Sequence, residues 1–463
     1  MAETKFKPAP INQVHPYYDL VVIGSGGAGL TAALQAHELG LSVCVLEKMP
    51  QVGGNTNRAS SGMNAAETQV QLDHHIVDSM DAFYDETLKG GGGKNNKELL
   101  RYFTDHSALA IDWLAHHGVI LNELTITGGM STMRTHRPAS KAAIGGFLVK
   151  SLLNLVVKEG IQVFTDVKVT DLIVENGKVD GVKAKFSDQK IVTAAGAVLL
   201  ATGGFAANQE LLTKYRPDLK GYKTTNQPGA TGDGILLAQK IGAKLVDMDQ
   251  VQVHPTVQQD TDHTYLIGEA VRGEGAILVN KAGQRFTNEL DTRKNVTAKI
   301  DALHEGGAYL IFDQGIRDQV KAVDFYDSVG LVMHGDSLSQ LAQEAGLNGD
   351  NLEDTVKQWN QAVNQGEDAE FKRTTGMERD ISHGPYYAIH IAPAVHYTMG
   401  GVAINKQTQV LNEQDQPIAG LYAAGEIVGG LHGNNRIGGN SIAETVIFGR
   451  QAGEQAFAYV KGK

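Results

Sequence analysis

Residues 20–34 read LVVIGSGGAGLTAAL. The apolar residues Leu20–Ile23 have the composition of a short buried strand, and the glycine turn after them leads into a helical pattern that ends at Gly40. A second apolar strand, Leu41–Leu46, follows and ends at Glu47. The segment therefore predicts a strand–helix–strand unit of about thirty residues.

The turn Gly24–Gly29 (GSGGAG) fits the pattern G-x-G-x-x-G of a dinucleotide-binding site. In that pattern Gly24 permits the tight turn, Gly26 lets the backbone approach a pyrophosphate, and Gly29 lets the helix pack closely on the strand. The helix N-terminus offers N–H groups to the phosphates, and Glu47 can accept the ribose hydroxyls. The pattern alone is weak, but its place between a strand and a helix, with an acid after the next strand, makes it specific.

Two further glycine turns help to distinguish the possible dinucleotides. They are Ala201–Gly204 (ATGG) and Ala424–Glu426 (AGE), and the segment Lys48–Thr56 extends the first site. A domain for a nicotinamide dinucleotide needs neither a second contact strand nor a return near the C-terminus. An extended, embedded FAD needs several close approaches of backbone, and the loop Asn57–Gly62 could then flank the flavin ring. The sequence therefore predicts FAD.

The composition argues against several classes of protein. The formal net charge of −11 argues against a nucleic-acid binder, and an anionic substrate would need a local basic cluster. The single cysteine, Cys44, lies in an apolar run and excludes an internal disulfide, a cysteine-bound iron–sulfur cluster and a c-type haem. No run approaches the ~18 apolar residues of a membrane span, and the first residues lack a secretory signal. We expect a cytoplasmic protein without a membrane span.

The length of 463 residues suggests two or three domains. Residues from about 246 to 380 are more charged than the rest and contain helix-like segments such as Leu338–Ala345 and Leu352–Asn364. We predict an α/β fold, in which a discontinuous Rossmann-like FAD-binding domain, residues 1–245 and 381–463, carries an inserted α+β capping domain, residues 246–380.

Six separate motifs give the chain a resemblance to a known family. The motifs are Glu47-Lys48 with Gly53-Gly54-Asn55, Ala201–Gly204 (ATGG), Gln227–Gly234 (QPGATGDG), Glu269–Gly275 (EAVRGEG), His396–Gly401 (HYTMGG) and Asn435–Asn440 (NRIGGN). In this order they resemble the flavoprotein subunits of fumarate reductase and succinate dehydrogenase. The soluble branch with the flavocytochrome fumarate reductases and urocanate reductase is the most similar, and the resemblance runs from about Tyr18 to the C-terminus.

The resemblance implies how the cofactor is held and reduced. In the membrane-bound members a histidine near the first loop tethers FAD, but the stretch Asn57–Asn64 has no histidine. We therefore expect non-covalent FAD. Soluble relatives carry haem domains or an FMN module, and this sequence has neither. We expect an external electron donor, either a reductase partner or reduced flavin.

The reaction implied by the resemblance is the reduction of an α,β-unsaturated carboxylate, in anaerobic respiration. Reduced flavin gives a hydride to one alkene carbon, and the other carbon is protonated. Negative charge builds on the carboxylate as the hydride arrives, so fixed cations are needed. By resemblance His396 and Arg436 would bind one carboxylate of a small dicarboxylate or enoate. His254 would hold the far end, and Gln252 lies close by in sequence.

The same resemblance makes Arg293 the proton donor, supplied through Glu269 and Arg272. A guanidinium is almost always protonated, which makes it an unusual acid. Two interpretations stay open. Either Arg293 loses its proton only transiently, with simultaneous replacement through Glu269, or it mainly stabilises charge while another group protonates the substrate.

The resemblance also marks the residues that would contact FAD. They come from the turn, from the segment after Glu47 and from loops along the whole chain. The set is Gly24, Ser25, Gly26, Gly27, Ala28, Gly29, Glu47, Lys48, Gly53, Gly54, Asn55, Thr56, Ser60, Ser61, Gly62, Val167, Thr202, Gly203, Gly204, Thr231, Gly232, Asp233, His396, Gly425, Glu426, Arg436, Ser441 and Ile442. No metal ligands are predicted.

The sequence departs from the family pattern at the substrate site. Gly268 stands where fumarate reductases of this branch have a threonine that helps to hold the distal carboxylate, and Tyr397 stands where some relatives have a second histidine. Fumarate is the preferred substrate, because the cationic set is intact. Gly268 opens room for other enoates of the urocanate, cinnamate or acrylate type. A ketosteroid-type flavin dehydrogenase, which would favour tyrosine hydroxyls over cations, and a flavin-carrying subunit without catalysis are two different functions that the fold would also allow.

Overall fold

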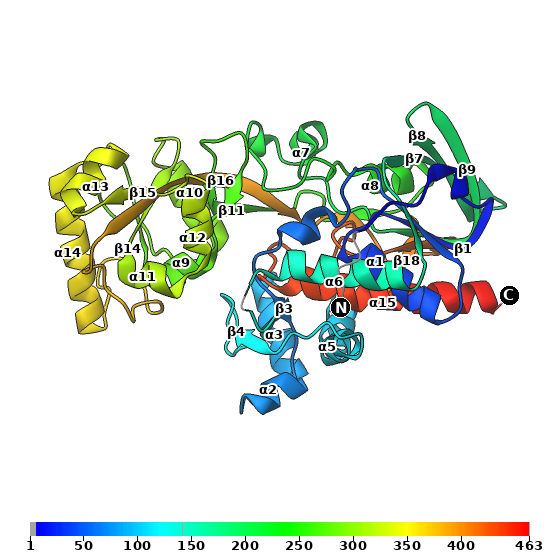
Figure 1. Ribbon diagram of the computed structural model, residues 1–463, viewed down its shortest axis with the longest axis horizontal. Helices are drawn as coiled ribbons and strands as arrows, with labels where there is room; N and C mark the ends of the chain where they lie inside the picture. Colours follow the sequence, from blue (N-terminus) through cyan, green and yellow to red (C-terminus); the bar gives the residue numbers. More distant parts are fainter. Residues whose placement is uncertain (1–5, 141, 463) are drawn as a thin grey trace. The chain divides into compact units, whose positions relative to one another are not determined.

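The computed structural model describes residues 6–140 and 142–462 and divides into two compact units. The nucleotide unit comprises Met1–Lys220, Asn226–Val251 and Tyr397–Lys463. The inserted unit comprises Gly221–Thr225 and Gln252–His396, and it contains the yellow-green and yellow elements of Figure 1.

The main sheet of the nucleotide unit confirms the predicted α/β fold. Its strands are β1 (Tyr17–Ile23), β2 (Val43–Leu46), β6 (Gln162–Phe164), β7 (Val167–Glu175), β8 (Lys178–Phe186), β9 (Gln189–Leu200), β18 (Gln409–Leu411) and β19 (Pro417–Ala423). They lie in the order β18-β19-β8-β9-β1-β2-β6, with β7 paired to β8. The strands β19, β9, β1, β2 and β6 pair in parallel. Central parallel strands are covered on both faces, and this explains why Leu20–Ile23 and Val43–Leu46 are continuous apolar runs with every side chain buried.

Two helices pack against each other beside this sheet (Figure 1): α1 (Gly27–Glu38) and α15 (Asn440–Lys461). Their contact depends on small residues, because a Cβ on Gly449 would lie only 2.8 Å from the carbonyl oxygen of Ala28. The C-terminal helix α15 therefore packs directly against α1, the helix that follows the glycine turn.

The other elements of the nucleotide unit are shorter. They include a three-stranded sheet in the order β3-β5-β4 and the two-stranded pair β10–β17. The strands are β3 (Met63–Asn64), β4 (Glu123–Thr125), β5 (Thr135–Arg137), β10 (Leu245–Val246) and β17 (Gly401–Val402). The helices are η1 (Ile11–Gln13), η2 (Gly54–Arg58), α2 (Gln69–Asp73), α3 (Met80–Gly90), α4 (Lys97–Asp105), α5 (Ser107–His116), α6 (Ile144–Lys158), α7 (Gln209–Tyr215), η3 (Pro217–Leu219) and α8 (Asp233–Lys240).

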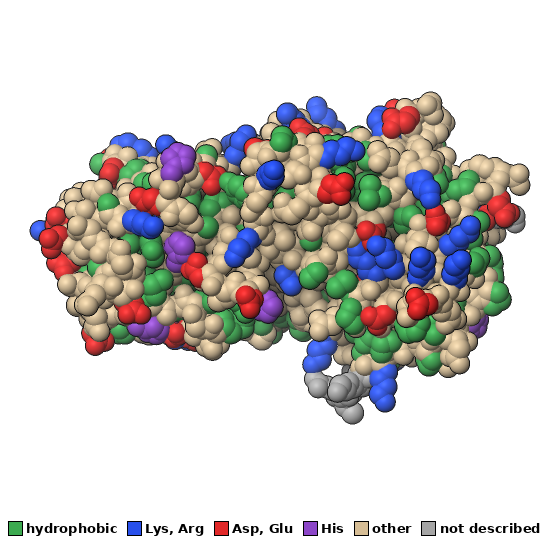
Figure 2. Space-filling view, turned by 90° about the horizontal axis from the view of Figure 1, so that it is seen from above, with side chains coloured by type: hydrophobic (Ala, Val, Ile, Leu, Met, Phe, Trp, Pro, Cys, Tyr) green, Lys and Arg blue, Asp and Glu red, His purple; other side chains and the backbone are tan. Residues whose placement is uncertain are grey.

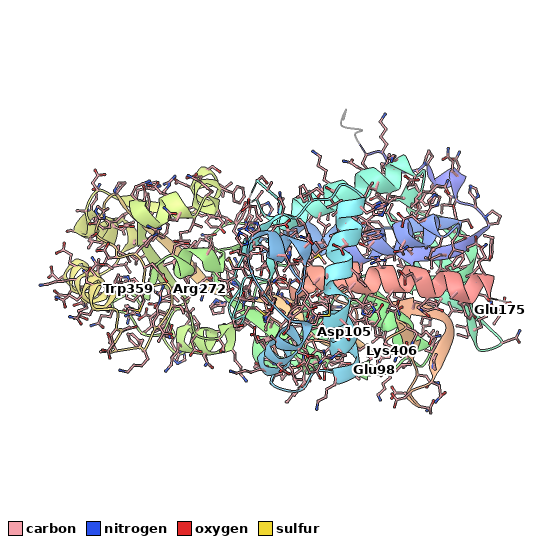
Figure 3. The ribbon with its side chains drawn as sticks, turned by 90° about the horizontal axis from the view of Figure 1, so that it is seen from below. Glu98, Asp105, Glu175, Arg272, Trp359 and Lys406 are labelled. Atoms are coloured by element: carbon pink, nitrogen blue, oxygen red, sulfur yellow. The ribbon has the colours of Figure 1, made fainter. Side chains whose placement is uncertain are left out.

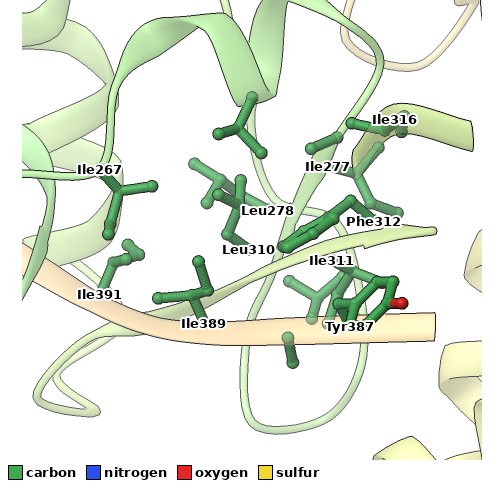
Figure 4. Close-up of a cluster of buried hydrophobic side chains, with 14 of the residues drawn as sticks. Ile267, Ile277, Leu278, Leu310, Ile311, Phe312, Ile316, Tyr387, Ile389 and Ile391 are labelled. Atoms are coloured by element: carbon green, nitrogen blue, oxygen red, sulfur yellow. The ribbon is translucent and has the colours of Figure 1, made fainter. Parts of the chain in front are cut away.

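The inserted unit has a mixed architecture of its own. Its strands are β11 (Val251–Gln258), β12 (Tyr265–Leu266), β13 (Ile277–Val279), β14 (Ala308–Asp313), β15 (Met333–Gly335) and β16 (Tyr386–Thr398), in the order β12-β11-β16-β14-β13 with β15 paired to β16. Its helices are α9 (Glu269–Gly273), α10 (Arg293–Asp301), α11 (Gln314–Gln319), α12 (Ala322–Ser328), α13 (Leu338–Ala345) and α14 (Gly349–Gln365). Figure 4 shows its core, where side chains of β13, β14 and β16 such as Leu278, Leu310 and Ile389 are fully buried.

The division between the units differs from the boundaries predicted at 245/246 and 380/381. It falls at 251/252 and 396/397, and the short segment Gly221–Thr225 joins the inserted unit. The reason is β16, a single strand of thirteen residues that pairs with β14 and β15 before it continues into the nucleotide unit. In the part of the chain that the structure describes, no helix combines the length and the apolar character needed to cross a membrane.

Candidate active site

The glycine turn shows the steric constraints that its motif predicts. Gly24 has a φ of +106°, and a Cβ there would overlap the carbonyl oxygen of Ala201. A Cβ on Gly29 would overlap the carbonyl oxygen of Gly24, so both positions require glycine. By contrast, a Cβ on Gly26 would come no closer than 3.7 Å to any neighbour, at Oγ1 of Thr56. The backbone at Gly26, which caps the N-terminus of α1, is thus left open to a ligand.

A buried carboxylate ties this turn to the segment that follows β2. Oε2 of Glu47 accepts hydrogen bonds from the N–H and the hydroxyl of Ser25, at 3.0 and 2.6 Å. The Ser25 hydroxyl oxygen in turn accepts from the N–H of Gly53 at 3.1 Å, and Oε1 of Glu47 accepts from the N–H of Met49 at 2.8 Å. Glu47 therefore stands at the end of its strand as predicted and holds the turn and the next loop in one framework.

Several other residues predicted to contact the cofactor lie in the same framework. Lys48 Nζ donates to Oγ1 of Thr231 at 2.6 Å and lies 3.0 Å from Oδ2 of Asp233. Nδ2 of Asn55 donates to Oε2 of Glu426 at 3.3 Å. Burial raises the pKa of the Glu426 carboxyl to about 7.

The remaining predicted cofactor residues are spread over the nucleotide unit. Val167 starts β7, Gly62 directly precedes β3, and Ile442 is buried in α15. The Ser441 hydroxyl lies 3.3 Å from Nη1 of Arg436, whose guanidinium donates to it. The structure assigns no contact to Ser60 and Ser61 that would define their role, which stays a prediction.

The inserted unit gathers charged and polar residues that are remote in sequence. Arg293 begins α10, and its Nε donates to Oε1 of Glu269 at 2.7 Å. Its Nη1 donates to Oε1 of Gln252 on β11 at 2.8 Å. Because a guanidinium is planar, the two bonds fix its orientation as well as its position.

Arg272 is the most deeply buried cation of this group. It lies on α9, 2% exposed, and its Nη1 donates to the main-chain oxygen of Glu289 at 2.6 Å. Its Nη2 lies 3.8 Å from Oε1 of Glu269. Among the described residues, its Nε and Nη2 have no hydrogen-bond acceptor. Burial lowers the pKa of Arg272 to about 10, with the Glu269 carboxylate opposing that shift.

Two histidines complete the set in the inserted unit. The rings of His254 and His396 lie 5.5 Å apart between centroids, at an angle of 67°. His254 is 1% exposed, and its Nδ1 accepts from the N–H of Thr256 at 3.3 Å. Nδ1 of His396 and the Thr225 hydroxyl are hydrogen-bonded at 2.8 Å. The structure thus places Gln252, His254, Glu269, Arg272, Arg293 and His396 in one unit, whereas Arg436 belongs to the nucleotide unit.

Comparison with known proteins places the chain in a family. The family model described as "FAD binding domain" matches residues 19–442. NADH:fumarate oxidoreductase of Klebsiella pneumoniae (strain 342) is 50% identical over 446 residues, 96% of this chain and 48% of that protein. Fumarate reductase 1 of Saccharomyces cerevisiae is 38% identical over 464 residues, 94% of this chain and 97% of that protein. The chain belongs to the FAD-dependent fumarate reductase family.

A solved structure agrees with this family assignment. The open conformation of a flavocytochrome c3 fumarate reductase has a TM-score of 0.85 and 38% sequence identity, and the match covers 97% of this chain and 79% of that one. The expected fold class, family and FAD cofactor are therefore confirmed. The chain spans about half the length of the Klebsiella NADH:fumarate oxidoreductase.

The nucleotide unit of this fumarate reductase family member has the groups that an FAD needs. In addition to the open backbone at Gly26 and the Glu47 carboxylate, it holds buried polar atoms without a partner among the described residues. These include Oγ1 of Thr202 and Nδ2 of Asn440, both from motifs of the family. Gly203 has a φ of +73°, and a Cβ there would have no neighbour within 4 Å. Such unpartnered groups and open backbone fit an extended dinucleotide.

Sequence reasoning missed residues that support the predicted ones. In the nucleotide unit, the guanidinium carbon of Arg436 lies 4.4 Å from the centre of the Tyr397 ring. The Tyr397 hydroxyl donates to Glu444, and Nε2 of His432 lies 2.9 Å from the other Glu444 oxygen. Burial, followed by the charge of Glu444, raises the pKa of Tyr397 well above its usual value. The residue that replaces a second histidine therefore forms a cation–π platform for Arg436.

In the inserted unit the missed residues surround Arg272. Arg373 is 1% exposed, and its Nη2 donates to the main-chain oxygen of Arg272 at 2.5 Å. Its Nη1 donates to Oε2 of Glu289 at 3.1 Å, so Glu289 and Arg373 together hold the side chain and the backbone of Arg272. The centre of the Trp359 ring lies 4.6 Å from the guanidinium carbon of Arg373, and Figure 3 shows Trp359 and Arg272 in the same unit.

Proposed function

We propose that the chain reduces an α,β-unsaturated carboxylate, with fumarate to succinate as the preferred reaction. The observation that carries the proposal is the hydrogen-bonded set of Arg293, Glu269 and Gln252, with Arg272 buried behind it. Reduction of an enoate builds negative charge on its carboxylate, and fixed cations in a site with little water stabilise that charge best. The FAD, when bound, supplies the hydride for one alkene carbon.

The protein's own residues would supply the proton for the other carbon. Arg293 is oriented by two acceptors, so one of its N–H groups can be aimed at a substrate carbon. The side chain of Glu269 is 34% exposed, whereas that of Arg272 is only 3% exposed. Glu269 can therefore receive protons from solvent and pass them to Arg293. The opposing interpretation, in which Arg293 only stabilises charge, predicts that another group donates the proton.

The arginines of the inserted unit support the local basic cluster that an anionic substrate needs in a protein with a net charge of −11. On the face shown in Figure 2, acidic and basic side chains are mixed and no single acidic field covers it. An anion bound beside Arg293 would also lie near the positive charge of the buried Arg272, which stands 3.8 Å from the same Glu269 carboxylate. Local attraction of this kind can outweigh an unfavourable average charge, since the field is screened beyond about 8 Å at physiological salt.

The electron donor is external in this proposal. A reductase partner or reduced flavin would deliver electrons to the FAD. We also propose that the FAD is non-covalent and that the protein works in the cytoplasm. Release of FAD on acid precipitation tests the first point, and cell fractionation with an antibody tests the second.

A steady-state assay tests the proposed reaction. The FAD-loaded protein is mixed with an anaerobically reduced viologen dye and a panel that contains fumarate, acrylate, urocanate and cinnamate. The proposal expects fumarate to oxidise the dye with the highest kcat/KM. Higher kcat/KM for a singly charged acid would favour the second candidate, an enoate reductase of that type, for which Gly268 is the supporting feature. If no enoate oxidises the dye, the proposed function is wrong.

A further inference from the structure

A buried phenol lies at the start of the helix that carries Glu269. Tyr326 belongs to α12 and is 6% exposed. Its hydroxyl oxygen accepts a hydrogen bond from the N–H of Gly268 at 3.1 Å. Gly268 is the N-cap of α9 and directly precedes Glu269, the residue that binds Arg293. The phenol thus contacts the residue that directly precedes Glu269, a member of the proposed proton path.

The proton of this hydroxyl has no hydrogen-bond acceptor among the residues that the structure describes. The bond from Gly268 uses the oxygen as an acceptor, so the O–H is still available as a donor. A buried donor without a partner is costly, and buried polar groups in proteins are nearly always paired. Burial raises the pKa of Tyr326, which keeps the phenol protonated and able to donate at neutral pH. The Tyr326 hydroxyl can therefore donate a hydrogen bond to an acceptor on a bound ligand.

The position of the hydroxyl also matches the missing side chain at Gly268. A Cβ built on Gly268 would have one atom within 4 Å apart from its chain neighbours, and that atom is the Tyr326 oxygen at 3.6 Å. Gly268 has a φ of −59°, so nothing in its backbone requires glycine. The absence of a side chain therefore leaves room beside the phenol rather than relieving strain.

We propose that Tyr326 is a substrate-binding residue that selects dicarboxylates. Its O–H donates to an oxygen of the substrate's second carboxylate, which does not take up the negative charge that develops in the reaction. That carboxylate lies at the position that Gly268 leaves open. A carboxylate is the expected acceptor because Glu269, the residue after Gly268, contacts Arg293 and Arg272, whose positive charges favour an anion. This inference rests on the proposed function and adds a determinant of its substrate class.

Two tyrosine-to-phenylalanine substitutions test the assignment in the FAD-loaded protein. Tyr326→Phe removes the hydroxyl that Gly268 contacts, while Tyr265→Phe removes one in β12 of the same unit that makes no hydrogen bond among the described residues. For Tyr326→Phe we expect the KM for fumarate to rise about tenfold with kcat within about twofold, because a ground-state contact to a charged group is lost. The KM for acrylate, which has one carboxylate, should not change, and Tyr265→Phe should change neither.

Two outcomes would overturn the assignment. One is that Tyr326→Phe and Tyr265→Phe have the same KM for fumarate, and the other is that KM rises equally for fumarate and acrylate, as a structural defect would cause. Titration of the flavin absorbance with succinate and propionate separates this inference from the reaction. If the wild-type protein reduces no enoate but Tyr326→Phe still weakens succinate binding and spares propionate, the proposed function fails and the assignment stands. Equal succinate affinity in both proteins contradicts it.

Discussion

The Nε–H of Arg293 donates to Oε1 of Glu269 over 2.7 Å, although the two residues lie 24 positions apart on different helices. Glu269 also lies 3.8 Å from Nη2 of Arg272. One carboxylate therefore stands between two cations, one partly exposed and one almost fully buried. This arrangement suits a path on which a proton enters at Glu269 and leaves from Arg293.

The first prediction concerns the orientation of Arg293. Lysine keeps the positive charge but cannot donate to Glu269 and Gln252 at once from a rigid plane. We expect Arg293→Lys to lower kcat for fumarate by at least about a hundredfold, the range found for a positioned general acid, with little change in succinate affinity. Steady-state assays with the reduced dye measure kcat, and flavin titration measures the affinity. Turnover within a few-fold of wild type would rule out Arg293 as a positioned proton donor.

The second prediction concerns the ion pair behind Arg272. Arg373 and Glu289 are both fully buried and bonded at 3.1 Å, and Nη2 of Arg373 also donates to the main-chain oxygens of Arg272 and Gly376. Glu289 keeps its pair with Arg285, but Arg373→Ala leaves these buried oxygens without their donor and opens a cavity beside Trp359. We therefore expect it to lower the free energy of unfolding by about 3–5 kcal/mol. Urea unfolding followed by Trp359 fluorescence, in a Trp113→Phe background, reports on the inserted unit.

A matched control for that ion pair exists on the surface. Arg379 lies 3.3 Å from Glu274, and both side chains are about two-fifths exposed. Arg379→Ala should cost less than about 1 kcal/mol, because exposed pairs contribute little. Equal losses for Arg373→Ala and Arg379→Ala would contradict the role given to the buried pair.

The third prediction concerns the glycine turn. A Cβ on Gly29 would overlap the carbonyl oxygen of Gly24, so Gly29→Ala must displace the backbone at the start of α1. We expect the purified variant to have lost most of its FAD, as shown by a low ratio of absorbance at 450 nm to that at 280 nm (about the flavin and protein maxima). Gly146 on α6 has nothing within 4 Å of the place that a Cβ would occupy, so Gly146→Ala should retain FAD. Full FAD content in Gly29→Ala would show that the turn tolerates a side chain.

The fourth prediction concerns pH. Burial raises the pKa of Glu426 to about 7, from an ordinary value of 4.5. Between these values the native protein holds a proton that the unfolded chain has lost, so stability falls as the pH rises from about 4.5 to about 7. We expect Glu426→Gln to flatten this part of the dependence of the urea midpoint on pH, while Glu274→Gln at an exposed position does not. Parallel curves for wild type and Glu426→Gln would contradict the shift.

The sequence predicted well those features that depend on local pattern. The strand–helix–strand unit appears as β1, α1 and β2 within a few residues of the expected bounds, because apolar runs and steric glycines act over short distances. The helix predicted over Leu338–Ala345 is present in the structure with the same bounds, as α13. The family motifs also led to the residues that the inserted unit gathers.

The sequence could not show features that depend on pairing across long distances. Nothing local marks Arg373 as buried, and its partners Glu289 and Arg272 lie 84 and 101 residues away. Tyr326 is 58 residues from Gly268, so its contact could not be read from spacing. The second division between the units lies later than predicted, because most of β16 pairs with β14 and β15 inside the inserted unit.

A single-turnover experiment tests the central claim most directly. The FAD-loaded protein is photoreduced without oxygen and mixed with fumarate while the flavin absorbance is followed. The account predicts that the flavin is reoxidised and that one succinate forms per FAD, as the transfer of one hydride and one proton requires. Flavin that stays reduced in the presence of fumarate and of every other enoate, yet is reoxidised by oxygen, would contradict it.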